Sequence, residues 1–234
     1  MKIESTIVDK TTQIDFASVL ASSVHDMKNS LCLLIQSIDN LSEQAKALNA
    51  DSELAKLHYE ASRLNTNLLQ LLSLYRAEKD QLPINIDEYH ILDIAEEIIT
   101  QNQLYLDSRK IQVEIDIEPD LTWYLDLDLI SNLLNDVFIN AMRYTNNKIF
   151  IQAALNKNQL VVTVEDDGSG YTENMLKQTE LNMHEINLTS GHTGLGLFFA
   201  KLIARSHQNN NLTGQVELKN GGRLGGSQFI LTLP

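Results

Sequence analysis

The sequence is poor in cysteine, proline and basic residues, and each shortage excludes a class of protein. One cysteine among 234 residues cannot form an internal disulfide, and three prolines do not make a proline-rich linker. Lysine and arginine number 18 against 31 acidic residues, a net charge of −13, and they form no cluster. We therefore expect no nucleic-acid partner and no anionic-membrane surface, because phosphate contacts need clustered cations.

Long apolar runs are also missing. The run at 31–35 is far shorter than the about 18 residues that a membrane span needs, and the N-terminal MKIESTIVDK has no apolar signal-peptide core. With the single cysteine, this predicts a cytoplasmic protein without a membrane span. The hydrophobic content of 43% excludes wholesale disorder, and the length is typical of one or two domains.

Glycine and proline are absent from residues 14–80, where apolar residues recur at steps of four and three. The first series is Leu20, Val24, Met27, Leu31, Leu34, Ile38, Leu41, Ala45 and Leu48. After a polar break at 49–52, the second is Leu54, Leu57, Ala61, Leu64, Leu68, Leu71 and Tyr75. Two such series predict an antiparallel helical hairpin. Further apolar residues beside the first series favour a homodimeric four-helix bundle over a coiled-coil spacer.

The periodicity changes at Pro83, which divides the chain into a hairpin domain (1–82) and a second domain (83–234). Helices are expected over 91–103 and 127–144. Alternating apolar residues predict strands over 111–117, 148–155, 160–165 and 228–233, the middle two forming a hairpin through 156–158. This mixture predicts an α/β sandwich with one sheet and one helical layer. We expect His58, His90 and His207 at the surface or at its boundary.

Three groups of residues in the second domain could carry chemistry. Asp136, Asn140, Arg143 and Tyr144 recur at steps of four, three and four, so they share one face of the helix at 127–144. Carboxylate and carboxamide oxygens suit Mg²⁺, and a nearby arginine could neutralise phosphate. Taken alone, this group is better explained as a solvated helix face.

The other two groups are rich in glycine. The segment EDDGSG at 165–170 follows an apolar strand, where a carboxylate could accept a hydrogen bond from an exocyclic amine. The segment GHTGLGL at 191–197 is expected to begin a helix. The free N–H groups and the positive dipole end of a helix N-terminus favour the binding of an anion. This segment has neither a preceding strand nor the spacing of a dinucleotide fingerprint, and no phosphate-binding loop with the GxxxxGK[ST] pattern occurs.

The order of these groups resembles the sensor histidine kinases of two-component systems. NDVFINAMRYT (135–145) is similar to the N box, DDGSG (166–170) to the G1 box and GHTGLGL (191–197) to the G2 box of their Bergerat-type ATP-binding domain. SSVHDMKNSL (22–31) is similar to the H box of the dimerisation and phosphotransfer domain, and GGSQFILTLP is similar to the closing strand. The resemblance covers roughly residues 18–234.

The resemblance implies ATP and Mg²⁺ as ligands. Asn140 would bind Mg²⁺, Arg143 would contact phosphate, Tyr144 would line the nucleotide and Asp166 would hold the adenine amine. Further nucleotide-binding positions would be Gly168, Gly170, Thr193, Gly194, Leu195 and Gly196. Residues 171–190 would form the ATP lid.

The H box implies that His25 takes the γ-phosphoryl group and passes it to an aspartate on the receiver domain of a response regulator. Asp26 would fix the tautomer of the imidazole, and Asn29 would position water for removing phosphate from the regulator. No input domain fits before the hairpin, so we expect a separate sensor protein as a partner, or a longer chain.

Three residues depart from the family pattern. Asp136 stands where the N box usually has Asn, and it could bind Mg²⁺ or order water. Ser30 replaces the usual proline of the H box, which predicts a straighter first helix. His192 replaces a glycine at the end of the lid. Two alternatives stay open, namely an anti-sigma-factor-type protein-serine kinase and a phosphotransfer or scaffold dimer with a degenerate ATP site.

Overall fold

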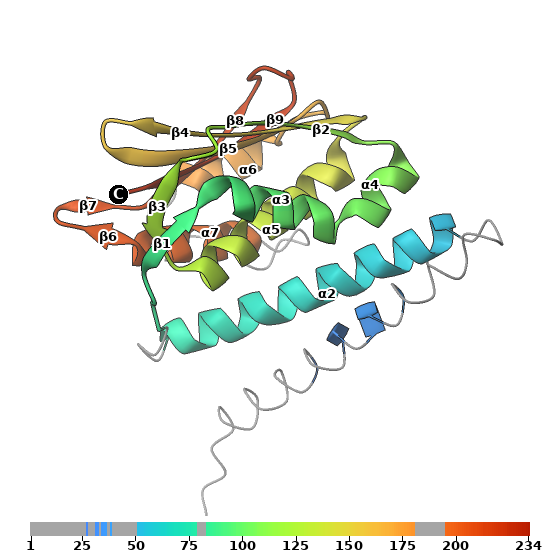
Figure 1. Cartoon of the computed structure of the whole chain (residues 1–234), viewed down its shortest axis with the longest axis horizontal. Helices are drawn as coiled ribbons and strands as arrows, with labels where there is room; N and C mark the ends of the chain where they lie inside the picture. Colours follow the sequence, from blue (N-terminus) through green and yellow to red (C-terminus); the bar gives the residue numbers. More distant parts are fainter. Residues whose placement is uncertain are drawn as a thin grey trace, which may run out of the picture.

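The computed structural model describes residues 27, 31, 32, 34–36, 38, 51–78, 83–180 and 195–234. A long helix, α2 (Asp51–Glu78), precedes a layered α/β unit (Figure 1). The helices of that unit are α3 (Ile91–Gln101), α4 (Gln103–Arg109), α5 (Leu127–Tyr144), α6 (Glu173–Glu180) and α7 (Leu195–Ser206). Its strands are β1 (Asp87–His90), β2 (Gln112–Ile117), β3 (Thr122–Leu125), β4 (Lys148–Asn156), β5 (Gln159–Asp166), β6 (Gln208–Asn209), β7 (Leu212–Thr213), β8 (Gln215–Asn220) and β9 (Ser227–Leu233).

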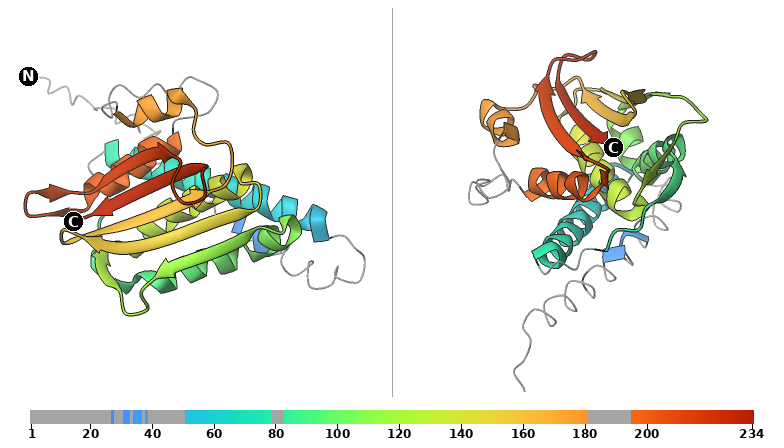
Figure 2. Two further views of the ribbon diagram at one scale, coloured as in Figure 1. Left: turned by 90° about the horizontal axis from the view of Figure 1, so that it is seen from above. Right: turned by 90° about the vertical axis from the view of Figure 1, so that its left-hand side faces the viewer.

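The main sheet has the strand order β2-β4-β5-β9-β8, with β2 parallel to β4 and the other neighbours antiparallel. Figure 2 shows this sheet as one layer, with α3, α5 and α7 on one of its faces. Two short antiparallel pairs, β1 with β3 and β6 with β7, lie apart from it. The α/β sandwich predicted for the second domain is therefore confirmed.

Most of the elements predicted in this domain are present, and the helix at 127–144 has the predicted bounds. The β4–β5 hairpin turns at Lys157 and Asn158, which both have positive φ, as a two-residue type I′ turn requires. The helix predicted over 91–103 ends at Gln101, and a second helix, α4, follows Asn102. The buried Asn102 side chain explains this break, because its Nδ2 donates to the Ile98 carbonyl (2.8 Å) and to Asn135 Oδ1 (2.9 Å).

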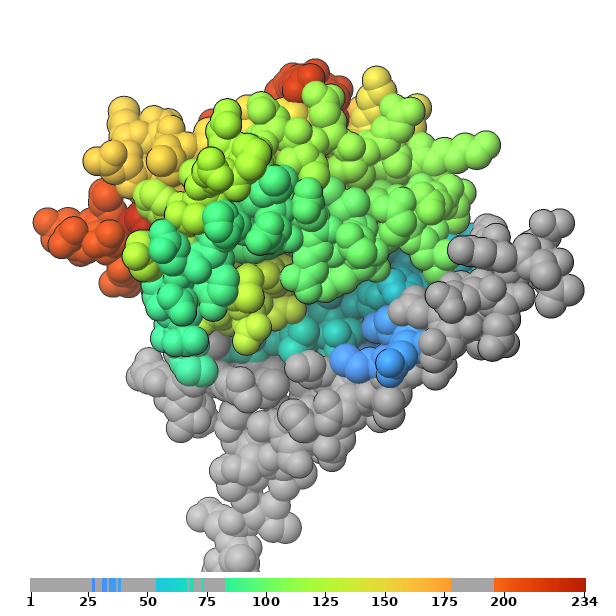
Figure 3. Space-filling view, in the orientation of Figure 1, coloured from blue at the N-terminus to red at the C-terminus, as the bar shows by residue number. Residues whose placement is uncertain are grey.

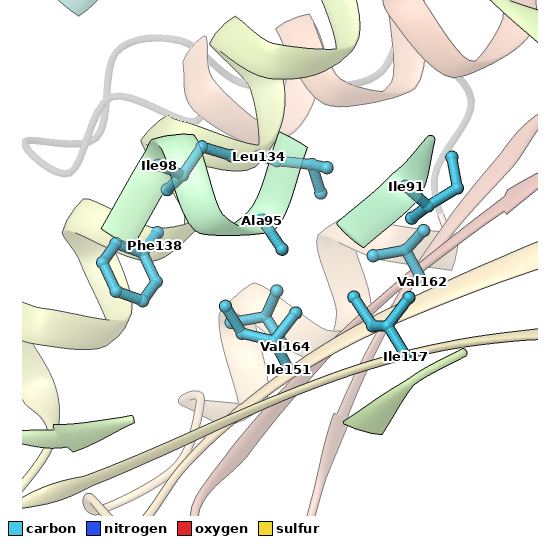
Figure 4. A pocket seen from close by; sticks show the side chains of 9 residues that line it. All are labelled: Ile91, Ala95, Ile98, Ile117, Leu134, Phe138, Ile151, Val162 and Val164. Atoms are coloured by element: carbon cyan, nitrogen blue, oxygen red, sulfur yellow. The ribbon is translucent and has the colours of Figure 1, made fainter. Parts of the chain in front are cut away.

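The core lies between the sheet and its helical layer. Figure 4 shows apolar side chains from α3, α5 and the strands pointing into a common interior. They enclose a cavity of about 20 Å³ whose lining is Ile91, Ala95, Ile98, Ile117, Leu134, Phe138, Ile151, Val162 and Val164. Because these side chains offer a water molecule no polar partner, we interpret the cavity as a small gap in the packing of the core and not as a ligand site.

Asp126 and His207 join three segments at the start of α5. The Asp126 carboxylate caps α5 by accepting from Leu129 N–H (3.0 Å), and it also accepts from Asn85 N–H (2.7 Å). His207 Nε2 accepts from Asp126 N–H (3.0 Å), and its Nδ1 lies 2.8 Å from the Ile203 carbonyl of α7. These contacts require a neutral imidazole with its proton on Nδ1.

Two of the three histidines expected at the surface are buried. His207 and His58 are 3% and 6% exposed, whereas His90 is exposed as expected. The expectation was wrong for His207 because one ring nitrogen binds Ile203 in the preceding helix, α7, and the other binds Asp126, which is 81 residues away in the sequence. Burial lowers the pKa of His207, although the Ile203 carbonyl and Asp126 act in the opposite direction.

Helix α2 presents two different faces. Tyr59 is buried and stacks on Tyr105 of α4, with ring centroids 4.5 Å apart, and its burial raises the pKa of its hydroxyl to about 12. Leu57 and Leu64 belong to the second apolar series of the predicted helical hairpin, and they are 57% and 50% exposed. Figure 3 shows the surface of α2 directly below that of α4. Among the described residues, no helix is long and apolar enough to cross a membrane.

We predict that stability depends on pH through His207. Its folded pKa lies below the unfolded value, so the stabilisation is present above about pH 6.5 and is lost as the pH falls below it. His207→Phe should lower the free energy of unfolding at pH 7.5 by about 1–3 kcal/mol, because Asp126 N–H loses its acceptor. Urea titrations at pH 7.5 and 5.5 measure this.

The exposed His90 provides the control, since His90→Phe should change the free energy of unfolding little at either pH. The unsubstituted chain should lose more stability between pH 7.5 and 5.5 than the His207 variant. Equal losses in the two proteins would show that His207 does not titrate as a buried neutral group.

Candidate functional site

Three consecutive carboxylates at the end of β5 bind three different segments of the chain. Glu165 and Asp166 are 5% and 3% exposed, and Asp167 is half-buried. Alternation along the strand and the turn that follows it point neighbouring side chains in different directions. The carboxylates therefore do not compete for the same partners.

Within the described part of the chain, the Asp166 carboxylate has three hydrogen-bond donors. Its Oδ1 accepts from Gly168 N–H (2.7 Å) and Ser227 N–H (3.3 Å), and its Oδ2 accepts from Ser227 Oγ (2.5 Å). A carboxylate has about four acceptor positions, so one stays open on Oδ2. An exocyclic amine is a donor that fits this position.

Asp167 fixes the loop between α5 and β4. Its Oδ1 accepts from the Thr145 hydroxyl (2.5 Å) and from the backbone N–H groups of Asn146 (2.8 Å), Asn147 (3.1 Å) and Lys148 (3.1 Å). Partial burial raises the pKa of Asp167, but these hydrogen bonds favour the carboxylate and make the net shift downward. The carboxylate thus stays charged and holds the end of α5 against the end of β5.

Glu165 holds the turn between β8 and β9. Its Oε2 accepts from the backbone N–H groups of Arg223 (2.7 Å) and Leu224 (3.3 Å), and its Oε1 accepts from Gln228 Nε2 (2.7 Å). The Arg223 guanidinium lies 4.4 Å from the centre of the Phe150 ring and pairs with Glu114. This fixed turn carries Gly226, whose N–H donates to the Asp166 carbonyl (3.1 Å).

The polar face of α5 faces outward beside these carboxylates. Asn140, Arg143 and Tyr144 are exposed, and Asp136 is half-buried. The predicted apolar face is buried at Leu133, Leu134 and Ala141. The Arg143 guanidinium lies 5.4 Å from the centre of the Tyr144 ring, a cation–π arrangement.

Gly168 brings this helix and the carboxylates together. A Cβ atom at Gly168 would collide with the backbone carbonyl of Tyr144, so a larger residue would force the end of α5 away from β5. Helix α7 begins at Leu195, and its second residue, Gly196, is half-buried. Because α5 packs against both β5 and α7, the three predicted ATP-binding segments have their described parts on neighbouring elements.

Several predicted site residues lie outside the described residues. They are His25, Asp26, Asn29, Thr193 and Gly194. Of Leu195 only the backbone is described, and residues 181–190 of the expected lid are likewise outside the described ranges. The first part of that segment contains α6, whose first turn Thr172 caps by accepting from Met175 N–H (3.3 Å).

Sequence reasoning did not single out four residues that shape the site. They are Thr145, Asp167, Asn220 and Ser227. Ser227 is 61 residues from Asp166, and Asn220 is 49 residues from Tyr171, so no local pattern links them. Asp167 had a local indication, because an aspartate before a glycine in a turn often bonds nearby backbone N–H groups.

A polar groove of about 220 Å³ lies elsewhere, between α3 and α5. Its lining is Ile94, Glu97, Ile98, Gln101, Leu127, Asp128, Ser131, Asn132 and Asn135, which includes no predicted site residue. Within the described part of the chain, no three His, Cys, Asp or Glu side chains gather to hold a metal ion. A Mg²⁺ ion that binds mainly to phosphate oxygens needs only one or two protein ligands, so Asn140 and Asp136 fit that donor set.

Known proteins are similar to the part of the chain that carries this site. Residues 125–234 match the family described as histidine kinase-, DNA gyrase B- and HSP90-like ATPases. The sensor protein SrrB of Staphylococcus aureus (strain NCTC 8325 / PS 47) is 26% identical over 182 residues. That alignment covers 75% of this chain, and the chain spans about 30% of the length of SrrB.

Solved structures share the fold. The histidine kinase AdeS of Acinetobacter baumannii superposes with a TM-score of 0.58 at 20% identity, covering 88% of this chain and 95% of that one. The catalytic domain of histidine kinase ThkA superposes with a TM-score of 0.54 at 21% identity, covering 64% and 95%. Residues 125–234 are thus similar in sequence to the histidine kinase-, DNA gyrase B- and HSP90-like ATPases, and the described chain shares the fold of these histidine kinase structures.

Proposed function

We propose that this chain is a protein-histidine kinase that phosphorylates His25 from MgATP and passes the phosphoryl group to an aspartate of a response regulator. The observation that carries the proposal is the Asp166 carboxylate, which is buried and which, among the described residues, has no cation partner and keeps one acceptor position open. A buried carboxylate with an open acceptor is costly unless a ligand donates to it. The exocyclic amine of adenine is that donor in the proposal.

The base and the phosphates would bind to different elements. Gly168 and Gly170 shape the turn beside the adenine, and Tyr144 lines the nucleotide. Asn140 and Asp136 supply oxygen ligands for Mg²⁺, which neutralises phosphate charge when it is bound. Arg143 reaches phosphate by leaving the Tyr144 ring, over which it lies.

The start of α7 would receive the remaining phosphate oxygens. Leu195 and Gly196 begin this helix, and Thr193 and Gly194 precede them in the sequence. Free backbone N–H groups point out of a helix N-terminus and favour an anion there. Residues 171–190 would then close over the nucleotide, which keeps water from the phosphoryl group.

The phosphoryl transfer itself uses the first helix. A neutral ring nitrogen of His25 attacks the γ-phosphorus, the bond from that phosphorus to the bridging oxygen breaks, and ADP leaves with the bond electrons. Asp26 accepts a hydrogen bond from the other ring nitrogen and stabilises the cationic imidazole as it forms. Asn29 positions water for a second activity, removal of phosphate from the regulator.

Assembly follows from the two faces of α2. The inner face packs on α4 through Tyr59, and the outer face exposes Leu57 and Leu64, seven residues apart. A heptad stripe that is exposed in one chain is buried by a second copy in a four-helix bundle. A homodimer is therefore part of the proposal, with a response regulator and a separate input protein as its partners.

We predict that Asp166→Asn weakens binding of ATP by about tenfold to a hundredfold, because the amide cannot accept from the adenine amine at the position of Oδ2. Binding of GTP, which lacks that amine, should change much less. Calorimetric titration with MgATP and MgGTP measures both affinities. Asp116→Asn, at an exposed carboxylate on β2, is the matched control. Equal affinity for ATP in the wild type and the Asp166 variant would contradict the adenine assignment.

His25→Gln should abolish labelling by γ-labelled ATP and leave the affinity for MgATP unchanged, because the nucleophile and the nucleotide site lie in different domains. His90→Gln, at an exposed histidine, should label normally. The label should be lost in acid and kept in alkali, as expected of a phosphoramidate. A label that survives in His25→Gln, or that resists acid as phosphoserine does, would favour the serine-kinase alternative.

The outer face of α2 gives a test of the dimer. Leu57→Glu combined with Leu64→Glu should convert the dimer into a monomer, because unpaired charges in an apolar interface cost several kcal/mol. Leu155→Glu introduces the same charge at a position that is 56% exposed on the β4–β5 hairpin, and should leave the dimer intact. Light scattering at micromolar concentration measures the mass. A monomeric wild type, or a dimeric double variant, would refute this interface.

A further inference from the structure

The segment directly after the Asp166 turn is held by one side chain from the far end of the chain. Asn220, the last residue of β8, accepts from Tyr171 N–H through Oδ1 (2.7 Å) and donates from Nδ2 to the Tyr171 carbonyl (2.9 Å). One carboxamide thus satisfies both backbone groups of Tyr171, as a neighbouring strand would. Neither hydrogen bond is predictable from local sequence, since 49 residues separate the two positions.

Gly170 makes this contact sterically accessible. Its φ is +81°, and a Cβ atom there would lie 2.8 Å from Asn220 Oδ1 and 2.9 Å from its Cγ. A larger residue would therefore displace the carboxamide as well as strain the backbone. The glycine and the asparagine form one unit that fixes the position of Tyr171.

Tyr171 lies next to the carboxylate assigned to the base. Burial and, to a smaller extent, the negative charge of Asp166 raise the pKa of its hydroxyl. Helix α6 begins two residues later and packs against β8. The Leu176 N–H donates to the Thr172 carbonyl (3.1 Å). This hydrogen bond ties the first turn of α6 to Thr172, the residue directly after Tyr171.

We propose that Asn220 is a positioning residue for the binding of ATP. Its carboxamide clamps Tyr171, so that residues 171–180 are held in a fixed geometry beside the Asp166 carboxylate. The inference rests on the proposed function, since it takes ATP as the ligand of Asp166. Asn220 acts through Tyr171 and needs no contact with the nucleotide. Without the clamp, residues 171–180 adopt the binding-competent arrangement only part of the time, and the nucleotide must order them as it binds. The affinity for the nucleotide is then reduced in proportion to the fraction of molecules in that arrangement.

The test compares Asn220→Ala with Lys219→Ala, which truncates an exposed neighbour on β8 that pairs with Glu217. In the nucleotide-free dimer, amide hydrogen exchange over residues 168–180 should accelerate about tenfold in Asn220→Ala, because two hydrogen bonds are lost. Exchange in β4 and β5 should not change, which separates a local clamp from a general loss of stability. The affinity for MgATP should fall by about tenfold. Lys219→Ala should match the wild type in both measurements.

A double variant tests the link to Gly170. Gly170→Ala alone should also weaken the binding of MgATP. In the double variant with Asn220→Ala, the fold-loss of affinity should be smaller than the product of the two single fold-losses. The reason is that truncating Asn220 removes the atoms that the new Cβ atom meets. Effects that multiply fully would overturn the idea that the two residues act as one unit.

The outcomes separate the two proposals. Faster exchange with weaker MgATP binding supports the positioning role of Asn220. Faster exchange with unchanged affinity overturns that role, and unchanged exchange overturns the clamp itself. A wild-type chain that binds no MgATP refutes the proposed function and the positioning role with it.

Discussion

The hydrogen bonds of the Asp167 carboxylate set the position of every other part of the site. They join the loop after α5 to the end of β5 through the Thr145 hydroxyl and three consecutive backbone N–H groups. Those N–H groups follow the end of a helix and lead into a strand, and Lys148 N–H also donates to Thr145 Oγ1 (3.0 Å). Because one charged acceptor satisfies them together, the polar face of α5 has a fixed register against Asp166.

The chain carries a large negative charge, yet three adjacent carboxylates are tolerated at this point. Each receives protein donors: Glu165 from the β8–β9 turn, Asp166 from Ser227 and Gly168, and Asp167 from the α5–β4 loop. Hydrogen bonds from N–H and O–H groups to a carboxylate are charge-assisted and offset its desolvation. Backbone N–H groups, the Thr145 and Ser227 hydroxyls and the Gln228 amide thus supply the donors of the site.

Helix α2 connects this unit to the rest of the chain by packing as well as by sequence. Its inner face places Tyr59 on Tyr105, with both rings almost fully buried, and the Tyr59 hydroxyl has no hydrogen-bond partner among the residues that the structure describes. An unsatisfied buried hydroxyl weakens a contact without abolishing it. The contact between α2 and α4 therefore depends on apolar packing and ring stacking, to which this hydroxyl adds no hydrogen bond.

The sequence by itself determined the elements of the ATPase domain and the residue types of its site. Alternation predicted β2, β4, β5 and β9, the 3.6-residue period predicted α5, and the turn residues predicted the β4–β5 hairpin, because each depends on contacts between near neighbours. The order of the Asn140, Asp166 and Gly196 segments indicated the resemblance to histidine kinases. Only the tertiary structure decided the partners of those residues. Ser227 on Asp166, Asn220 on Tyr171 and His207 on Asp126 join positions 49 to 81 residues apart, and the break at Asn102 depends on a bond to Asn135. Periodicity records which face of an element is apolar, whereas a polar side chain finds its partner only when the packed layers bring distant segments within about 3 Å.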